Sequence, residues 1–171
     1  MGVMEKIFLN VKPFQETLHA NMCDPASLKI LLSYYGIDKS EQVLAQLANV
    51  VHDVGIDDKS IARVAESLGF KVQIKNESSF SDIEEWLKRG VPVIVDWFTH
   101  GRSDYSDSEV ADSHYSVVIG LDDEYIYLQD PEIGAVRKIK REDFMRVWFD
   151  FLGELIKSEE LIIRQIIAIY K

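Results

Sequence analysis

The sequence predicts an α+β domain in which helices come first and an antiparallel sheet follows. Apolar residues recur at helical spacing through most of the first half, for example at Leu28, Leu31 and Leu32. The second half instead alternates apolar and polar residues in short runs separated by turn residues. The 171 residues, 47% of them hydrophobic, are enough for one sizeable core, and no linker or repeat divides them. We therefore expect a single domain over residues 1–171.

Capping residues, a proline and glycines mark where the helices begin and end. Pro25 suits the first turn of a helix because its missing N–H would be unpaired there, and Gly36 ends that helix. Ser40 is the expected N-cap of the second helix. Ser81 and Glu84 form a capping-box pattern before the fourth. Helices are expected over residues 25–35, 41–51, 57–68, 82–89 and 142–151.

Strands are indicated by short runs of β-branched and aromatic residues that turns separate. The run at 91–97 is strongly apolar, and an Asp-Asp-Glu turn after residue 121 is a good hairpin signal. The residues before this hairpin, 99–113, are polar and acidic, a long loop of the kind that often carries function. Strands are expected over residues 6–11, 70–74, 91–97, 115–121, 125–129, 135–140 and 161–170.

Charge and composition argue against several classes of protein. The net charge of −10 disfavours nucleic acid or an anionic membrane surface as partner. A single cysteine excludes an intramolecular disulfide and fits a reducing compartment. The N-terminus lacks the apolar run of a signal peptide, and no stretch approaches the roughly 18 consecutive apolar residues of a membrane span. We therefore expect a soluble, cytoplasmic protein with no membrane partner.

The lone cysteine, Cys23, stands at or just before the start of the first helix. The helix dipole favours a thiolate at this end, so Cys23 is a candidate nucleophile. A lone cysteine is more often a small apolar residue of the core. The assignment therefore depends on partners elsewhere in the chain.

Three further residues provide the partners that a nucleophilic thiol needs. His114 opens the strand after the polar loop, where an imidazole is held firmly and stays open to substrate. Asp130 ends the next strand, so a hairpin brings its carboxylate to the ring N–H of His114 and fixes the tautomer. The side-chain amide of Gln15, with the backbone N–H of Cys23, can donate to the oxyanion of a tetrahedral intermediate.

These residues resemble the papain-like cysteine peptidases that process double-glycine leaders of bacteriocins, namely the start of that family and its histidine and aspartate block. The first part of the resemblance is Phe-Gln, then Cys-Asp-Pro-Ala-Ser-Leu and a helix ending in Ser-Tyr-Tyr-Gly. The second part is Gly-Val-Pro-Val-Ile-Val-Asp at 90–96 and His-Tyr-Ser-Val-Val-Ile-Gly-Leu-Asp-Asp-Glu-Tyr-Ile-Tyr-Leu-Gln-Asp-Pro at 114–131. Together they cover roughly residues 10–140, in the order Gln, Cys, His, Asp. The resemblance implies a papain-like fold, with a helical layer packed on the sheet.

The resemblance also implies a role for each candidate: Cys23 as nucleophile, His114 as base and acid, Asp130 as orienting group and Gln15 as oxyanion donor. Two positions depart from the family pattern. Asp24 stands where the family usually has glycine, and its carboxylate either raises the pKa of the Cys23 thiol or caps the helix. For an active peptidase we expect the capping arrangement. Gln15 lies eight residues before Cys23, two more than the commonest spacing.

Other candidates are assigned to the surface, to loops or to the core. The remaining histidines are expected in surface or loop positions, with His100 as the main alternative to His114: His19, His52 and His100. Three aspartates of the acidic loop lack the glycine and terminal glutamate of a calcium loop: Asp104, Asp107 and Asp112. We therefore expect neither metal nor cofactor. The tryptophans are more typical of a core than of a ligand cage: Trp86, Trp97 and Trp148.

Three functions remain open at this point. The first is a thiol peptidase that cleaves a peptide or isopeptide bond of a peptide or protein substrate. The second keeps the same residues but transfers the acyl group to an amine, because a thioester can be resolved by water or by another nucleophile. The third is a peptide-binding module in which Asp24 has silenced turnover.

Overall fold

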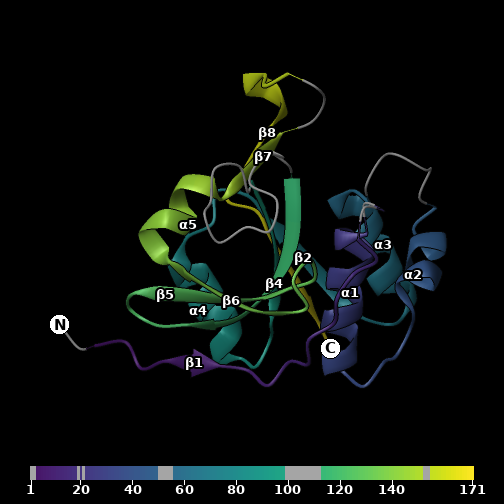
Figure 1. Cartoon of the computed structure of the whole chain (residues 1–171), viewed down its shortest axis with the longest axis horizontal. Coiled ribbons are helices and arrows are strands. Elements are labelled where there is room, and N and C mark those ends of the chain that lie inside the picture. Colours follow the sequence, from purple (N-terminus) through teal and green to yellow (C-terminus); the bar gives the residue numbers. More distant parts are fainter. Residues whose placement is uncertain (1–2, 19, 21, 50–55, 99–112, 152–154) are drawn as a thin grey trace.

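A seven-stranded antiparallel sheet forms the centre of the molecule (Figure 1). The computed structural model describes residues 3–18, 20, 22–49, 56–98, 113–151 and 155–171. The strand order is β2-β9-β3-β4-β5-β6, and β1 pairs with β4 outside this path. The strands are β1 Ile7–Phe8, β2 Lys71–Lys75, β3 Val93–Phe98, β4 Ser113–Leu121, β5 Tyr125–Asp130, β6 Ala135–Lys140 and β9 Ile166–Tyr170. Strands β7 Phe149–Phe151 and β8 Leu161–Ile163 form a separate pair that projects at the top of Figure 1.

Helices cover both faces of this sheet (Figure 1). One face carries α1 Cys23–Tyr34, α2 Glu41–Leu47 and α3 Asp58–Ser67, and the other carries α4 Phe80–Lys88 and α5 Arg141–Val147. The predicted α+β class, with an N-terminal helical layer on an antiparallel sheet, is confirmed. Helix α4 departs from that layer because its apolar side chains belong to the opposite core. None of the helices in the described part of the chain has the length and apolar character of a membrane span.

Two apolar cores follow from the alternation of side chains along the central strands. In β3, Ile94 faces the core beneath α1, whereas Val93 and Val95 face the core beneath α4. In β4, Tyr115 and Val117 likewise face α1. The tryptophans lie in the second core, as predicted: Trp86, Trp97 and Trp148.

The start of α4 differs from the sequence-based prediction. The capping box is formed by Ser79 and Asp82, not by Ser81 and Glu84, which lie inside the helix. Both pairs have the required spacing, so local pattern alone cannot choose between them. The choice follows from burial of Phe80, which packs on aromatic rings of the second core and begins the helix earlier.

The C-terminal part also differs, because two expected elements each divide in two. The helix expected over 142–151 ends at Val147 and is followed by β7. The strand expected over 161–170 divides into β8 and β9, which belong to different sheets. Arg164 separates these strands with a left-handed φ of 47°, and its backbone N–H donates to the carbonyl of Trp148 over 3.0 Å. Isoleucines on both sides of Arg164 hide this break from pattern analysis.

Gly120 determines how closely β1 approaches the sheet. A Cβ atom at this position would lie 2.8 Å from the backbone oxygen of Ile7 and 2.8 Å from Cδ2 of Phe8. We expect Gly120→Ala to displace β1 and to lower the free energy of unfolding by about 1–3 kcal/mol. Urea unfolding followed by tryptophan fluorescence measures this change. A variant as stable as wild type would contradict the close packing of β1.

Candidate active site

Cys23 is the first residue of α1 and is half-buried. Its thiol donates a hydrogen bond to Oδ1 of Asp24 over 3.1 Å. One helical turn further on, the Ser27 hydroxyl donates to the backbone carbonyl of Tyr115 over 3.0 Å. Because Tyr115 directly follows His114, this bond fixes the first turn of α1 beside the predicted base.

The surroundings of Cys23 favour the neutral thiol. Burial raises the pKa of the Cys23 thiol, and the carboxylates of Asp24 and Glu16 raise it further. A hydrogen bond from the backbone of Tyr115 lowers this pKa, but the net value lies well above the ordinary one. The helix position alone predicted a thiolate, yet it is outweighed by burial and by neighbouring negative charge. The resting site therefore holds a protonated thiol.

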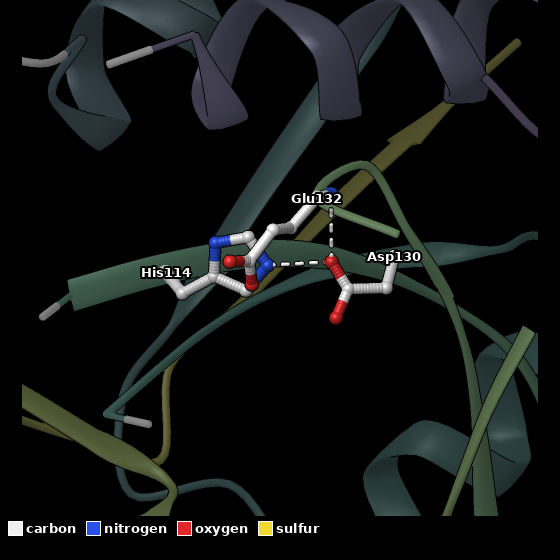
Figure 2. Close-up of side chains that lie close together, drawn as sticks. All are labelled: His114, Asp130 and Glu132. Atoms are coloured by element: carbon white, nitrogen blue, oxygen red, sulfur yellow. Dashed lines mark hydrogen bonds and ion pairs between the residues drawn. The ribbon is translucent and has the colours of Figure 1, made fainter. Parts of the chain in front are cut away.

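His114 and Asp130 come from adjacent strands and meet side by side, as Figure 2 shows. Nε2 of the imidazole lies 2.6 Å from Oδ1 of Asp130, and both side chains are buried. Burial by itself lowers the pKa of His114, but the charge and the hydrogen bond of Asp130, together with the charges of Glu16 and Glu132, outweigh burial, so the net pKa is raised. Nδ1 lies on the side of the ring away from Asp130 (Figure 2). It is the nitrogen through which a thiol would exchange its proton.

The Asp130 carboxylate also binds Arg137 of β6. Nε of Arg137 lies 2.6 Å from Oδ2 of Asp130, and the backbone N–H of Glu132 donates to Oδ1 over 3.0 Å. Burial by itself raises the pKa of Asp130, but His114 and Arg137 outweigh burial and hold the pKa below its ordinary value. The sequence pattern did not single out Arg137. The available signal was its inward position in β6, two residues before buried Ile139, since a buried arginine requires a carboxylate.

His114, Asp130 and Glu132 also form the kind of group that can hold a metal ion (Figure 2). Their ligand atoms all lie within 4.8 Å of one another. The guanidinium of Arg137 already lies 2.6 Å from Asp130 and 4.0 Å from Glu132. A metal ion would have to displace this positive charge and occupy the imidazole as well. The arrangement therefore fits proton transfer better than metal binding.

Gln15 and its neighbour Glu16 lie in different surroundings. Gln15 is exposed, and its side-chain amide donates to the backbone carbonyl of Glu132 over 3.1 Å. Glu16 is half-buried, and its charge interacts with those of Cys23 and His114. Burial raises the pKa of Glu16 to about 7. Nothing in the sequence marks Glu16, because only burial in the fold distinguishes it from an ordinary surface glutamate.

Asp24 is not the N-cap of α1, so the capping expectation is wrong. Met22 occupies the N-cap position and no side chain caps the helix, whereas Asp24 lies inside the first turn. Oδ1 of Asp24 accepts the thiol hydrogen bond, and Oδ2 accepts the backbone N–H of Ile56 over 2.5 Å. Burial raises the pKa of Asp24 to about 6. The backbone N–H that binds the Asp24 carboxylate therefore comes from Ile56, just before α3, and not from the first turn of α1 as expected.

Several other candidates lie outside the residues that the structure describes, and their assignments stay predictions. They are His19, His52, His100, Asp104, Asp107 and Asp112.

Asp24→Asn should lower the pKa of the Cys23 thiol, because it removes a neighbouring negative charge and keeps an acceptor for the Ile56 N–H. Alkylation by iodoacetamide, followed by intact mass across neutral and alkaline pH, should reach half its maximal rate at a lower pH. Asp38→Asn is the matched control, since the side chain of Asp38 is 90% exposed and pairs with Lys29. An unchanged alkylation profile in Asp24→Asn would show that its carboxylate does not act on the thiol.

Asp130→Asn should change how stability depends on pH. Because the folded state lowers the pKa of Asp130, its contribution is complete well above the ordinary value of about 4 and is lost as the pH falls through the lowered value. At neutral pH the free energy of unfolding of the variant should be lower by about 3–5 kcal/mol, since His114 and Arg137 each lose a buried anionic partner. Urea unfolding at neutral and acid pH should show that acidification lowers the free energy of unfolding less in the variant than in the wild type. Equal acid sensitivity in both proteins contradicts this role.

Comparison with known proteins places this chain in a family of C39-like peptidases. Residues 8–154 match the model of the Peptidase_C39 like family. The chain is 28% identical over 162 residues to the uncharacterized protein YvpB of Bacillus subtilis, covering 75% of this chain and 65% of YvpB. It is 29% identical over 128 residues to the transport/processing ATP-binding protein ComA of Streptococcus pneumoniae, covering 74% of this chain and 16% of ComA. The chain therefore spans only part of either relative.

Solved structures show the same fold. A C39-like peptidase from Bacillus anthracis has a TM-score of 0.69 at 22% identity, with 98% of each chain covered. A double glycine motif protease from an AMS/PCAT transporter, solved with its leader peptide, has a TM-score of 0.65 at 20% identity. The match covers 99% of this chain and 98% of the protease chain. The peptidase domain of Streptococcus ComA has a TM-score of 0.65 at 19% identity, and the match covers 94% of this chain and 98% of that domain. These matches confirm the fold that the sequence resemblance implied. With a family model matching most of its length, the chain belongs to the Peptidase_C39 like family, and the predicted enzyme class, a cysteine peptidase, is the class of that family.

Proposed function

We propose that this chain hydrolyses a peptide or isopeptide bond with Cys23, His114 and Asp130 as its catalytic triad. The observation that carries the proposal is the buried bond between His114 and Asp130. The next residue of the strand, Tyr115, accepts a hydrogen bond from Ser27 in the helix that begins at Cys23. A thiol, an imidazole and an orienting carboxylate are the parts that nucleophilic acyl transfer requires. Family membership supports the same chemistry.

The reaction starts from the neutral thiol. Nδ1 of His114 takes the thiol proton as Sγ of Cys23 attacks the carbonyl carbon, and Asp130 stabilises the imidazolium that forms. The imidazolium then protonates the departing amine, and the acyl group stays on Cys23 as a thioester. His114 next deprotonates a water molecule, which attacks the thioester and releases the carboxylic acid and the thiol.

Two donors are proposed for the oxyanion. The backbone N–H of Cys23 lies at the start of α1, where helix geometry provides no intrahelical acceptor. Gln15 engages one N–H of its amide with Glu132, so the other N–H is the one that would face an oxyanion. The substrate we propose is a peptide, in keeping with the leader peptide in the solved double glycine motif protease.

One observation favours a second candidate, a peptide-binding module without turnover. The carboxylate of Asp24 lies 3.1 Å from Sγ of Cys23 and, with burial, keeps the thiol protonated. In that case the chain binds a peptide at this site and the thiol stays unreactive.

The two candidates are distinguished by cleavage of a proteome-derived peptide mixture, with new termini identified by mass spectrometry. The peptidase predicts cleavage that is absent in Cys23→Ala and at least about 10³-fold slower in His114→Ala. Adding a small primary amine shows whether the acyl group is also transferred, since amide products then replace acids. Cleavage that persists in Cys23→Ala would contradict the triad. Peptide binding without cleavage in wild type would support the silent module.

A further inference from the structure

The turn between β5 and β6, residues 131–134, contacts the segment that carries Gln15. The backbone N–H of Glu16 donates to the carbonyl of Pro131 over 2.8 Å, and the side-chain amide of Gln15 donates to the carbonyl of Glu132 over 3.1 Å. Two successive carbonyls of the turn thus accept from two successive residues of the N-terminal segment. The proposed oxyanion donor is therefore held by a turn that lies 117 residues further along the chain.

Gly134 ends this turn in the left-handed region, with a φ of 60°. Its backbone N–H donates to the carbonyl of Asp130 over 2.9 Å, which closes the turn. A Cβ atom at Gly134 would lie 2.7 Å from Cβ of Gln15 and 3.3 Å from its Cα. These two atoms move only with the backbone of Gln15. The absence of a side chain at Gly134 therefore allows the turn and the Gln15 segment to meet.

Thr17 provides a second anchor for this segment, two residues after Gln15. Its backbone N–H lies 3.2 Å from each carboxylate oxygen of Glu41, and its hydroxyl also donates to this carboxylate. Glu41 belongs to the first turn of α2 and is only 3% exposed. The segment is therefore fixed to α2, and the turn is fixed through the buried bonds of Asp130. A side chain inserted between the turn and the segment would strain both attachments.

We propose that Gly134 is a positioning residue for Gln15, and that the β5–β6 turn places the Gln15 amide for the oxyanion. This inference rests on the proposed function, in which Gln15 and the backbone N–H of Cys23 are the two donors. One N–H of the Gln15 amide binds Glu132, which fixes the direction of the other. Donors stabilise a developing oxyanion best when they are in place before the reaction begins.

The base and the oxyanion donor thus have a common support. Asp130 directly precedes the turn and holds His114 over 2.6 Å, while Gly134 ends the turn against Gln15. Because the turn holds Gln15, the length of chain between Gln15 and Cys23 does not by itself decide where the amide lies. The spacing of eight residues is therefore compatible with an oxyanion donor at Gln15.

Gly134→Ala and Gly69→Ala form a matched pair of variants. Both glycines have a positive φ, 60° and 89°, so alanine introduces left-handed strain at each position. A Cβ at Gly69, after α3, would meet no atom of the described residues within 4 Å, whereas one at Gly134 would displace Gln15. A difference between the two variants therefore reports the contact with Gln15 and not the backbone strain.

Amide hydrogen exchange measured by NMR tests the placement without any substrate. In Gly134→Ala the backbone N–H of Glu16 should exchange about tenfold faster, as expected for loss of one hydrogen bond, here to Pro131. Gly69→Ala should leave this rate unchanged. Unchanged exchange at Glu16 in Gly134→Ala, or equal acceleration in both variants, overturns the proposal. If Gly134→Ala does not fold, Gly134→Asn replaces it, because asparagine carries the same Cβ and adopts positive φ more readily.

Turnover of a peptide that the wild type cleaves tests the consequence for catalysis. Gln15→Ala should lower kcat by about 10²–10³-fold, as for other oxyanion donors, and Gly134→Ala by at least about tenfold. The double variant should lose no more than Gln15→Ala alone, because the amide that Gly134 positions is already gone. The pH dependence of kcat/KM should keep its wild-type form in Gly134→Ala, since the bond between His114 and Asp130 is retained.

Additive losses in the double variant, or a shifted pH profile in Gly134→Ala, would mean that Gly134 acts through Asp130 and would overturn the proposal. Wild-type turnover with no effect of Gly134→Ala would overturn it as well, while leaving the proposed function intact. If the wild type cleaves no peptide, the proposed function fails, and the exchange rate of Glu16 still decides whether Gly134 places the Gln15 segment.

Discussion

The carboxylate of Asp130 connects three strands through charged hydrogen bonds. One oxygen lies 2.6 Å from His114 of β4 and the other lies 2.6 Å from Arg137 of β6, with Asp130 itself at the end of β5. Such a buried network is stable only when each charge has its partner. The orientation of the His114 imidazole and the attachment of the edge strand β6 to β5 therefore both depend on the carboxylate of Asp130.

The other half of the site depends on alternation in β4. Successive residues of a strand face opposite sides, so Tyr115 contributes to the core beneath α1 while the ring of His114 packs edge-on against Trp97. The bond from Ser27 to the Tyr115 carbonyl then fixes the helix start against this strand. The thiol and the imidazole are thus carried by a helix and a strand, which are more rigid supports than loops.

The surroundings of Cys23 are also rich in negative charge. Asp24 and Glu16 both disfavour a thiolate at Cys23, and burial raises the pKa of each carboxyl. A nucleophile in these surroundings stays protonated until a base removes the proton or a positive charge arrives. Asp24, at the position where the resemblance leads us to expect glycine, therefore raises the pKa of the Cys23 thiol, while the fold accommodates its carboxylate.

The sequence by itself determined the order of helices and strands as far as α5 and the pairing of His114 with Asp130, because periodicity and hairpin register are local properties. It did not determine the partners of Asp24, since the N–H of Ile56 comes from a segment 32 residues away. Only the tertiary structure decided that Glu16 is half-buried and that Arg137 neutralises Asp130. Burial and charge pairing arise where distant segments meet, and they decide which carboxylates stay ionised beside the thiol.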